Sequence, residues 1–249
     1  MDIQIERLGR SFSGVWGLKD VNATIRAGTI SVVVGANGAG KSTLLRLAGG
    51  RLCPTEGTVR YEGRLLRHNA VSLRRKSMLL DVDDIPFGGV CKIIASTIVD
   101  YSADRGNIEE VVSDWLRRFE IQDLVRTTGS EASKGQAYKA RLVSLFSINP
   151  PIWLLDEPMS AGLDANGLMI LEEQMMKHRA DGGTVVFTSQ WPRHAVRLAD
   201  DCLILDQGKL LWQGAPTRYD ASIDVPLSNV SLRAVIDGLT EATDRSVQT

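Results

Sequence analysis

The sequence lacks the features that mark a secreted or membrane-spanning protein. It has only three cysteines, Cys53, Cys91 and Cys202, an odd number without metal-ligand spacing. Such usage favours incidental thiols in a reducing compartment over a disulfide framework. No window approaches the roughly 18 apolar residues of a membrane-spanning helix. The first residues, MDIQIERLGR, contain no apolar core of a signal peptide. We therefore expect a cytoplasmic protein that does not cross a membrane by itself.

An excess of charge is missing as well. The chain carries 29 Lys and Arg against 30 Asp and Glu, which gives a formal net charge of −1. No strong overall field would therefore attract nucleic acid or an anionic membrane. The sequence contains no internal repeat and no low-complexity segment. What is present is a chain of 249 residues with 43% hydrophobic residues, long enough to bury a substantial core.

Short apolar runs alternate with helical stretches along most of the chain. Several of the runs are continuously apolar, as in strands that are covered on both faces. The alternation predicts an α/β fold with a largely parallel sheet. Strands are expected at Thr29–Val34, Thr58–Tyr61, Ser77–Leu80, Ile152–Leu155, Thr184–Thr188 and Cys202–Leu205, and helices at Lys41–Ala48, Ala165–Arg179 and Arg193–Leu198.

Two parts of the chain depart from this alternation. The first 30 residues read as antiparallel strands, and the middle of the chain is almost free of strands. In the middle we expect a helix over residues 90–99 and another over Asn107–Phe119, with Asn107 as its N-cap. A third helix begins near Ser133 and ends before Pro150, which cannot continue it.

The domain organisation follows from these patterns. We interpret residues 1–249 as one domain with an α/β core and an inserted helical lobe. The core comprises residues 1–85 and 148–215, and the helical lobe comprises residues 86–147. The tail, residues 216–249, is polar, and we assign it no function.

The most specific local pattern is GANGAGKST, which follows an apolar strand and opens a helix. Glycines in such a loop let backbone N–H groups close around a polyphosphate, and the helix start adds partial positive charge. Lys41 supplies a full charge for the β- and γ-phosphates, and the Ser42 hydroxyl is a candidate magnesium ligand. The candidate nucleotide-binding residues are Gly35, Asn37, Gly38, Ala39, Gly40, Lys41, Ser42 and Thr43.

A second pattern, IWLLDEP, places two acids at the end of an apolar strand. Asp156 would be carried toward a magnesium ion at the phosphate loop, which usually binds such an acid through water. Glu157 would then face the attacking water as a general base. The alternative is a strand that ends in ordinary solvated acids, and the phosphate loop in the same chain favours the functional interpretation.

Two further stretches flank this acid strand: ASKGQ at residues 132–136 precedes it, and SAGLD at residues 160–164 follows it. Together with the phosphate loop they resemble the nucleotide-binding subunits of ABC transporters over nearly the whole chain. ASKGQ matches the family's LSGGQ signature, and SAGLD matches its SALD loop with one inserted residue. WLLDEP followed by HRADGGTVVFTSQWP looks most like the cytochrome-c-maturation haem-export ATPases.

The resemblance implies an ABC-type P-loop ATPase fold that binds ATP and Mg²⁺ in a head-to-tail dimer with an identical or a different cassette. Each ATP would lie between the phosphate loop of one subunit and Ser133, Gly135 and Gln136 of the other. Asp164 also belongs to this family site, and Phe12 matches the aromatic that stacks on adenine. A transmembrane permease subunit would be the partner and would hold the chain at the cytoplasmic face of the cell membrane.

The sequence also argues against a nucleic-acid-associated member of this family. Such members have tandem cassettes, a long coiled-coil insertion or a basic surface, and the sequence has none of these.

Some positions depart from the family pattern. Lys134 replaces a glycine, and it either adds charge near the γ-phosphate, blocks close approach or faces solvent. The Gln that contacts magnesium and water in the family is absent, and Asp81 and Val82 occupy its place. Asp81 could still reach the metal. With Asp83 and Asp84 it could instead complement a basic partner surface or form an exposed acidic loop.

Gln190 occupies the place of the family's switch histidine. A glutamine can donate one hydrogen bond and accept another, but it carries no charge at pH 7. His194, one helical turn further on, is expected at the surface rather than as a replacement. We therefore predict slow ATP hydrolysis with Glu157, Gln190 and Lys41 as catalytic residues. The alternative is an ATP-gated regulatory or binding module with little or no turnover.

Overall fold

The structure is a computed structural model, and it describes residues 1–67, 70–81, 94–95, 97–98, 101, 107–126, 133–191 and 193–216. Most of the helix expected over residues 90–99 and the tail beyond residue 216 lie outside these ranges. Val82, Asp83 and Asp84 lie outside them as well.

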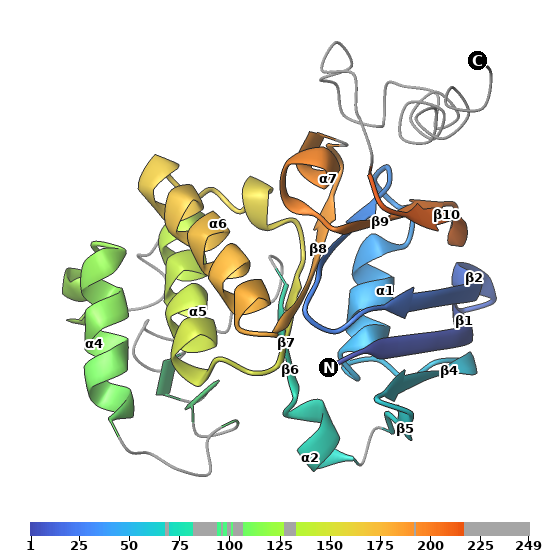
Figure 1. The fold of residues 1–249 in the computed structure, drawn as a ribbon, viewed down its shortest axis with the longest axis horizontal. Coiled ribbons are helices and arrows are strands. Elements are labelled where there is room, and N and C mark those ends of the chain that lie inside the picture. The colour runs from blue at the N-terminus through green and yellow to red at the C-terminus, as the bar shows by residue number, and fades with distance from the viewer. Residues whose placement is uncertain are drawn as a thin grey trace, which may run out of the picture.

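A six-stranded sheet forms the centre of the molecule (Figure 1). Neighbouring strands pair in parallel, except for β9 and β10, which form an antiparallel hairpin. Gln207 and Gly208 turn this hairpin, and both have positive φ, as two-residue hairpin turns require. The predicted parallel sheet is confirmed, whereas strand β10 was not predicted. In spatial order the strands are β10 (Lys209–Gly214), β9 (Asp201–Asp206), β3 (Ile30–Val34), β8 (Thr184–Ser189), β7 (Ile152–Leu155) and β6 (Ser77–Leu80).

A second, antiparallel sheet has four strands, and it confirms the prediction for the first 30 residues. Its order is β2 (Val15–Ile25), β1 (Ile3–Phe12), β4 (Glu56–Tyr61) and β5 (Arg64–Leu65). The two sheets meet where the Gln213 side-chain amide of β10 donates to the Thr24 carbonyl of β2 at 2.6 Å.

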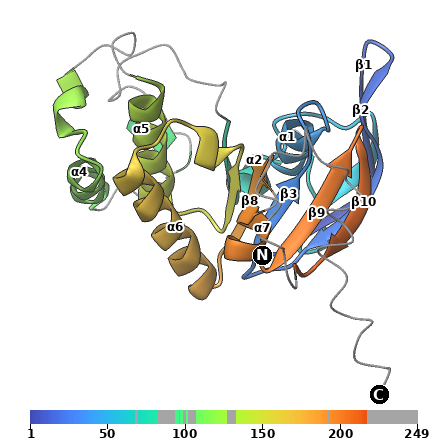
Figure 2. The ribbon, with the colours of Figure 1, turned by 90° about the horizontal axis from the view of Figure 1, so that it is seen from above.

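Helices cover both faces of the parallel sheet (Figures 1 and 2). Both views place α4, α5 and α6 together on one side of the sheet, whereas α1 packs with the antiparallel sheet on the other side. None of the helices in the described ranges is long and apolar enough to span a membrane. The helices are α1 (Lys41–Ala48), α2 (Val71–Arg74), α4 (Ile108–Arg118), α5 (Lys134–Ile148), α6 (Ala165–Ala180) and α7 (Arg193–Leu198), with 3₁₀ turns η1 (Gln122–Arg126) and η2 (Pro158–Ser160).

The continuous apolar strands supply two separate cores. Side chains alternate between the faces of a strand, so Trp153 and Leu155 of β7 pack with the helical side, while Ile152 and Leu154 pack with α1 and the antiparallel sheet. All four side chains are buried. A strand with both faces covered must be apolar at every position, which explains the runs seen in the sequence.

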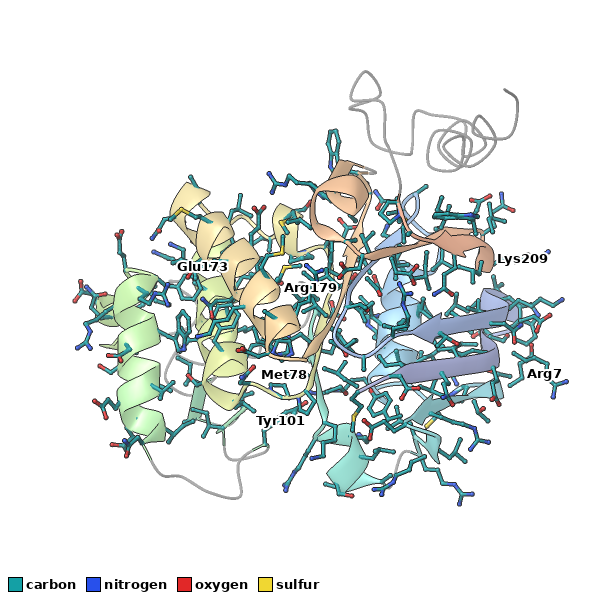
Figure 3. The ribbon with its side chains drawn as sticks, in the orientation of Figure 1. Arg7, Met78, Tyr101, Glu173, Arg179 and Lys209 are labelled. Carbon is teal, nitrogen blue, oxygen red and sulfur yellow. The ribbon has the colours of Figure 1, made fainter. Side chains whose placement is uncertain are left out.

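The helical lobe forms largely as predicted from the sequence. Ser133 caps α5, and Asn149, which ends this helix, adopts a left-handed conformation directly before Pro150. Asn107 stands at the N-cap position of α4 as predicted, although its side chain makes no cap hydrogen bond. Tyr101, labelled with Met78 in Figure 3, donates to the Ser77 carbonyl at 3.1 Å and so joins the lobe to β6.

A series of aromatic rings in contact joins this lobe to the sheet. Trp115 of α4 lies 4.9 Å from Phe146 of α5, between ring centroids, and Phe146 lies 5.2 Å from Trp153 of β7. Trp153 in turn stacks on His178 of α6 at 4.0 Å with an interplanar angle of 11°. Aromatic contacts of this kind add stability beyond the area they bury, and here they connect four elements through one series of contacts.

His178, the last ring of this series, is a buried side chain that can titrate. Its side chain hydrogen-bonds to the Pro151 backbone, and its Nε2 atom lies where a Cβ on Gly183 would stand. Burial lowers the pKa of His178 below the ordinary imidazole value, because desolvation disfavours the charged form. In the described residues Nε2 has no hydrogen-bond partner, so a proton added there would gain no compensating contact.

We expect the free energy of unfolding to decrease as the pH falls from 7.5 to 5.5. The unfolded chain binds a proton at His178 near the ordinary pKa of about 6.5, whereas the folded chain resists it, so stability is lost below that pH. In His178→Phe this loss should be smaller. Urea unfolding of both proteins at the two pH values measures it, and an equal loss in both would show that His178 is not its source.

Candidate functional site

The parallel sheet brings the predicted site residues to one edge. In the register of the sheet Val34 pairs with Ser189, Leu155 pairs with Phe187 and Leu80 pairs with Leu155. The carboxyl ends of β3, β8, β7 and β6 therefore lie side by side. Ligands of open α/β sheets bind at this edge, and the next residues along the chain are the phosphate loop, Gln190, the two acids and Asp81.

The phosphate loop, residues 35–43, has the backbone that a polyphosphate cradle needs. Gly38 and Gly40 have φ of 79° and 103°, where a side chain would be strained. A Cβ on Gly40 would stand 2.6 Å from the Gly17 carbonyl oxygen, and one on Gly35 would stand 2.6 Å from that of Leu205. Around Gly38, by contrast, none of the described residues beyond its own chain neighbours lies within 4 Å of that position, so the loop is open there.

Lys41 is buried and folds back into this loop. Its ammonium donates to the Gly35 and Ala36 carbonyls at 2.9 and 3.2 Å. The same Nζ atom lies 3.2 Å from the Glu157 carboxylate. A buried ammonium needs such partners because burial removes its water. These three contacts hold the ammonium within the glycine loop, beside Glu157.

Glu157 is held between two predicted catalytic residues. Gln190 donates its side-chain amide to both carboxylate oxygens of Glu157, at 3.0 and 2.9 Å, and Lys41 contacts one of them. The backbone of Glu157 has φ 43° and ψ 47°, a left-handed conformation that costs a residue other than glycine about 1–3 kcal/mol. The Glu157 N–H donates to the Thr188 hydroxyl at 2.8 Å, which helps to fix this conformation.

Asp156 and Ser42 supply the oxygen atoms that magnesium prefers. The Thr188 hydroxyl donates to Asp156 at 2.6 Å, and Ser42 also bonds to the Asp156 side chain. Burial raises the pKa of Asp156, and these two hydrogen bonds oppose the rise. One carboxylate and one hydroxyl fit a magnesium ion that also binds phosphate oxygens. Sequence reasoning missed Thr188, although a Thr at the end of β8 was visible.

The signature residues form a separate group at the start of α5. Ser133 accepts the Gln136 backbone N–H at 3.2 Å, and the Gln136 side chain accepts the Ser133 N–H at 2.8 Å, a capping box. A Cβ on Gly135 would stand only 2.1 Å from the Gly162 carbonyl oxygen, so the inserted glycine of SAGLD lies against the signature. Lys134 is exposed.

Asp164 belongs to this second group. It caps α6 by accepting the Gly167 N–H at 2.8 Å, and it pairs with Lys139 of α5 at 2.7 Å. These bonds, led by the one from Lys139, lower the pKa of Asp164. Among the described residues, no hydrogen bond or ion pair links the Ser133–Gln136 segment to the phosphate loop of the same chain.

Phe12 lies at the end of β1, against Gly17, whose carbonyl oxygen lies beside Gly40 of the phosphate loop. It is 45% exposed, the Arg10 guanidinium lies 5.1 Å from its ring centroid, and its ring edge fills the space where a Cβ on Gly17 would stand. An exposed aromatic ring at this position is free to stack, and its role toward adenine stays a prediction.

Two predictions are corrected by the side-chain packing. Asp81 is buried and bonds through Oδ2 to Arg46 of α1, at 2.7 Å from Nε and 2.6 Å from Nη2. Arg141 of α5 donates to the Asp81 carbonyl. The interpretation of Asp81 as part of an exposed or partner-facing acidic loop is therefore wrong. His194 is only 8% exposed, so its expected place at the surface is wrong too.

Comparison with known proteins gives a consistent result. The ABC transporter family profile matches residues 18–160. An ABC transporter ATP-binding protein of Archaeoglobus fulgidus is 30% identical over 225 residues, covering 88% of this chain and 76% of the relative. The cytochrome c biogenesis ATP-binding export protein CcmA of Idiomarina loihiensis is 28% identical, covering 75% of this chain and 84% of the relative.

A longer relative shows that the chain can match part of a larger protein. The spermidine/putrescine import ATP-binding protein PotA of Fusobacterium nucleatum is 29% identical over 226 residues. The alignment covers 90% of this chain, and the chain spans only 60% of the relative.

Solved structures share the fold. An ATP-binding subunit of an ABC transporter superposes with a TM-score of 0.79 and 23% identity, covering 96% of this chain and all of that one. An ATP-binding cassette in a dimeric, post-hydrolysis state bound to ADP and Pi gives a TM-score of 0.74 and 23% identity, with 86% of this chain and 98% of that chain covered.

Loss of Arg46 should lower the free energy of unfolding more than loss of the Asp81 charge. Arg46→Met removes a guanidinium bonded to the Asp81 carboxylate, which is 6% exposed, while Arg141 stays bonded to the Asp81 carbonyl. We expect a loss of about 2 kcal/mol in the free energy of unfolding. Asp81→Asn leaves Arg46, 41% exposed, able to reach water, and should cost about 1 kcal/mol. Urea unfolding measures both, and an equal or larger loss in Asp81→Asn would contradict the asymmetry.

Proposed function

The chain belongs to the ABC transporter family, and from this premise we propose that it is an ATP-binding subunit that hydrolyses ATP slowly, as a head-to-tail dimer, to drive a separate transmembrane permease. One observation carries the proposal: Glu157 contacts both Lys41 and Gln190 beside an open phosphate loop. The three side chains form a connected set of cation, base and neutral donor, placed where a γ-phosphate and its attacking water would lie.

ATP binding would exchange the contacts of Lys41. The phosphates take the place of the Gly35 and Ala36 carbonyls at the ammonium, and backbone N–H groups of the loop bind the remaining oxygens. The Ser42 hydroxyl and Asp156 would hold a magnesium ion, which neutralises charge on the phosphates when bound. Phe12 is the candidate contact for adenine.

Hydrolysis would then use Glu157 and Gln190. A water oxygen attacks the γ-phosphorus, Glu157 accepts a proton from that water, and the bond to the β-phosphate oxygen breaks to give ADP and phosphate. Release of Lys41 to the phosphates frees the Glu157 carboxylate to act as base. Gln190 keeps this carboxylate in place by donation, but it adds no positive charge near the γ-phosphate, which is the reason to expect a slow rate.

The second half of the site would come from another subunit. Ser133, Gly135 and Gln136 have no contact with the phosphate loop of their own chain among the described residues, although the start of α5 is suited to bind a phosphate. In a head-to-tail dimer these residues and Asp164 would face the ATP of the partner. The permease would hold the dimer at the cytoplasmic side of the membrane.

A second candidate function is an ATP-gated regulatory module with little turnover. The bond between Asp81 and Arg46 favours it, because this side chain is held by α1 where the family has a Gln that contacts magnesium and water. Steady-state phosphate release with and without the co-purified membrane partner separates the two functions. Stimulation by the partner supports the transporter subunit, and nucleotide-dependent dimers without phosphate release support the module.

We expect Glu157→Gln to lower kcat about 100-fold or more, because the variant has no base to accept the proton. The matched control is Glu173→Gln, which changes a carboxylate on α6 that pairs with Arg118 away from the site. Phosphate release by the purified proteins measures the effect. Equal turnover in wild type and Glu157→Gln would contradict the proposal that this site hydrolyses ATP.

We expect Gln190→His to leave kcat unchanged or to raise it. Histidine keeps a hydrogen-bond donor at this position and can carry positive charge near neutral pH. Gln190→Ala, which removes the donor, should lower kcat about tenfold or more. A large fall in Gln190→His would show instead that the site is tuned to the glutamine.

A further inference from the structure

His194 is a buried histidine that the hydrolysis described above does not use. It lies on α7, directly behind the switch position, and its exposed fraction is 8%. It also lines a cavity of about 420 Å³ between η2, α6 and α7, together with Glu172 and Trp191. A histidine with this burial is held by its neighbours, so its hydrogen bonds indicate what it does.

The bonds of His194 close the loop that carries Gln190. Its Nδ1 atom lies 2.7 Å from the Ser189 hydroxyl, and its backbone N–H donates to the Trp191 carbonyl at 3.2 Å. The Trp191 N–H donates to the same Ser189 hydroxyl at 2.9 Å. Ser189 Oγ also donates to the Trp191 carbonyl at 3.3 Å, so one hydroxyl bonds to His194 and to both backbone groups of Trp191.

Ser189 connects this loop to the phosphate site. Its carbonyl accepts the Gly35 N–H at 3.4 Å, and its backbone pairs with Val34 of β3. The next residue, Gln190, contacts both oxygens of Glu157. One continuous path therefore runs from His194 through Ser189 and Gln190 to Glu157.

We propose that His194 is a positioning residue for hydrolysis, which acts through Ser189 to hold the Gln190 backbone so that its amide stays on the Glu157 carboxylate. The inference rests on the proposed function. A glutamine side chain has several rotatable bonds, and an amide carries no charge to draw it to the carboxylate. Its position therefore depends on a fixed backbone, and a displacement of about 1 Å can cost about 100-fold in rate.

The test compares full-length wild type with His194→Ala, His194→Asn and Ser189→Ala. Asparagine places an amide atom where Nδ1 of histidine stands and can still bond to Ser189. We expect His194→Ala and Ser189→Ala to lower kcat about tenfold with little change in the KM for ATP, and His194→Asn to recover most of the loss. Because the two residues act in one path, the double alanine variant should lose no more than either single one.

His178→Phe is the matched control, since it alters another buried histidine, which lies near the start of β8 whereas this loop follows its end. It should change stability without changing kcat. Unchanged kcat in His194→Ala, a loss in His194→Asn equal to that in His194→Ala, or losses that add in the double variant would each overturn the proposal. If His194→Ala does not fold, Ser189→Ala and His194→Asn carry the same comparison.

A second measurement does not depend on turnover. Hydrogen exchange of the Trp191 amide should become about tenfold faster in His194→Ala and Ser189→Ala and stay near the wild-type rate in His194→Asn. Equal exchange in wild type and His194→Ala would overturn the positioning role. If wild type and Glu157→Gln turn over equally, the proposed hydrolysis fails, and the exchange rates then decide by themselves whether His194 holds the loop.

Discussion

Parallel pairing of β3, β8, β7 and β6 is the constraint from which the site follows. Each strand in a parallel sheet runs the same way, so the residues that come directly after the strands meet at one edge. The phosphate loop, Gln190, Glu157 and Asp81 reach this edge from four distant parts of the chain. The helices that cover the sheet make the strands apolar on both faces, and the polar groups of the site can therefore gather only where the strands end.

The charged and polar groups at this edge of the sheet bond to one another. Lys41 is buried and bonds to two loop carbonyls and to Glu157, and Gln190 occupies both oxygens of the same carboxylate. Because burial makes an unpaired charge expensive, the site needs these contacts before a ligand arrives. In the proposed function a polyphosphate would compete for Lys41, so its binding would also release the Glu157 carboxylate.

Asp81 and Gly162, which depart from the family pattern, make contacts within the chain. Asp81 is held by Arg46 of the phosphate-loop helix, and Arg141 of the signature helix bonds to its carbonyl. Asp81 therefore connects the α/β core with the helical lobe. The inserted Gly162 packs against Gly135, where neither residue can carry a side chain without a clash or strain. Both Asp81 and Gly162 therefore add contacts between the core and the signature helix.

The sequence by itself determined the features that are local along the chain. The glycine loop with its helix, the apolar strands with their acids and the capping box of Ser133 and Gln136 could be predicted because neighbouring residues alone set them. The tertiary structure decided which distant side chains meet. Asp81 bonds to Arg46, which is 35 residues away, and Arg141 bonds to the Asp81 carbonyl across 60 residues. Such contacts depend on how helices settle on the sheet, and no pattern of spacing in the sequence specifies that.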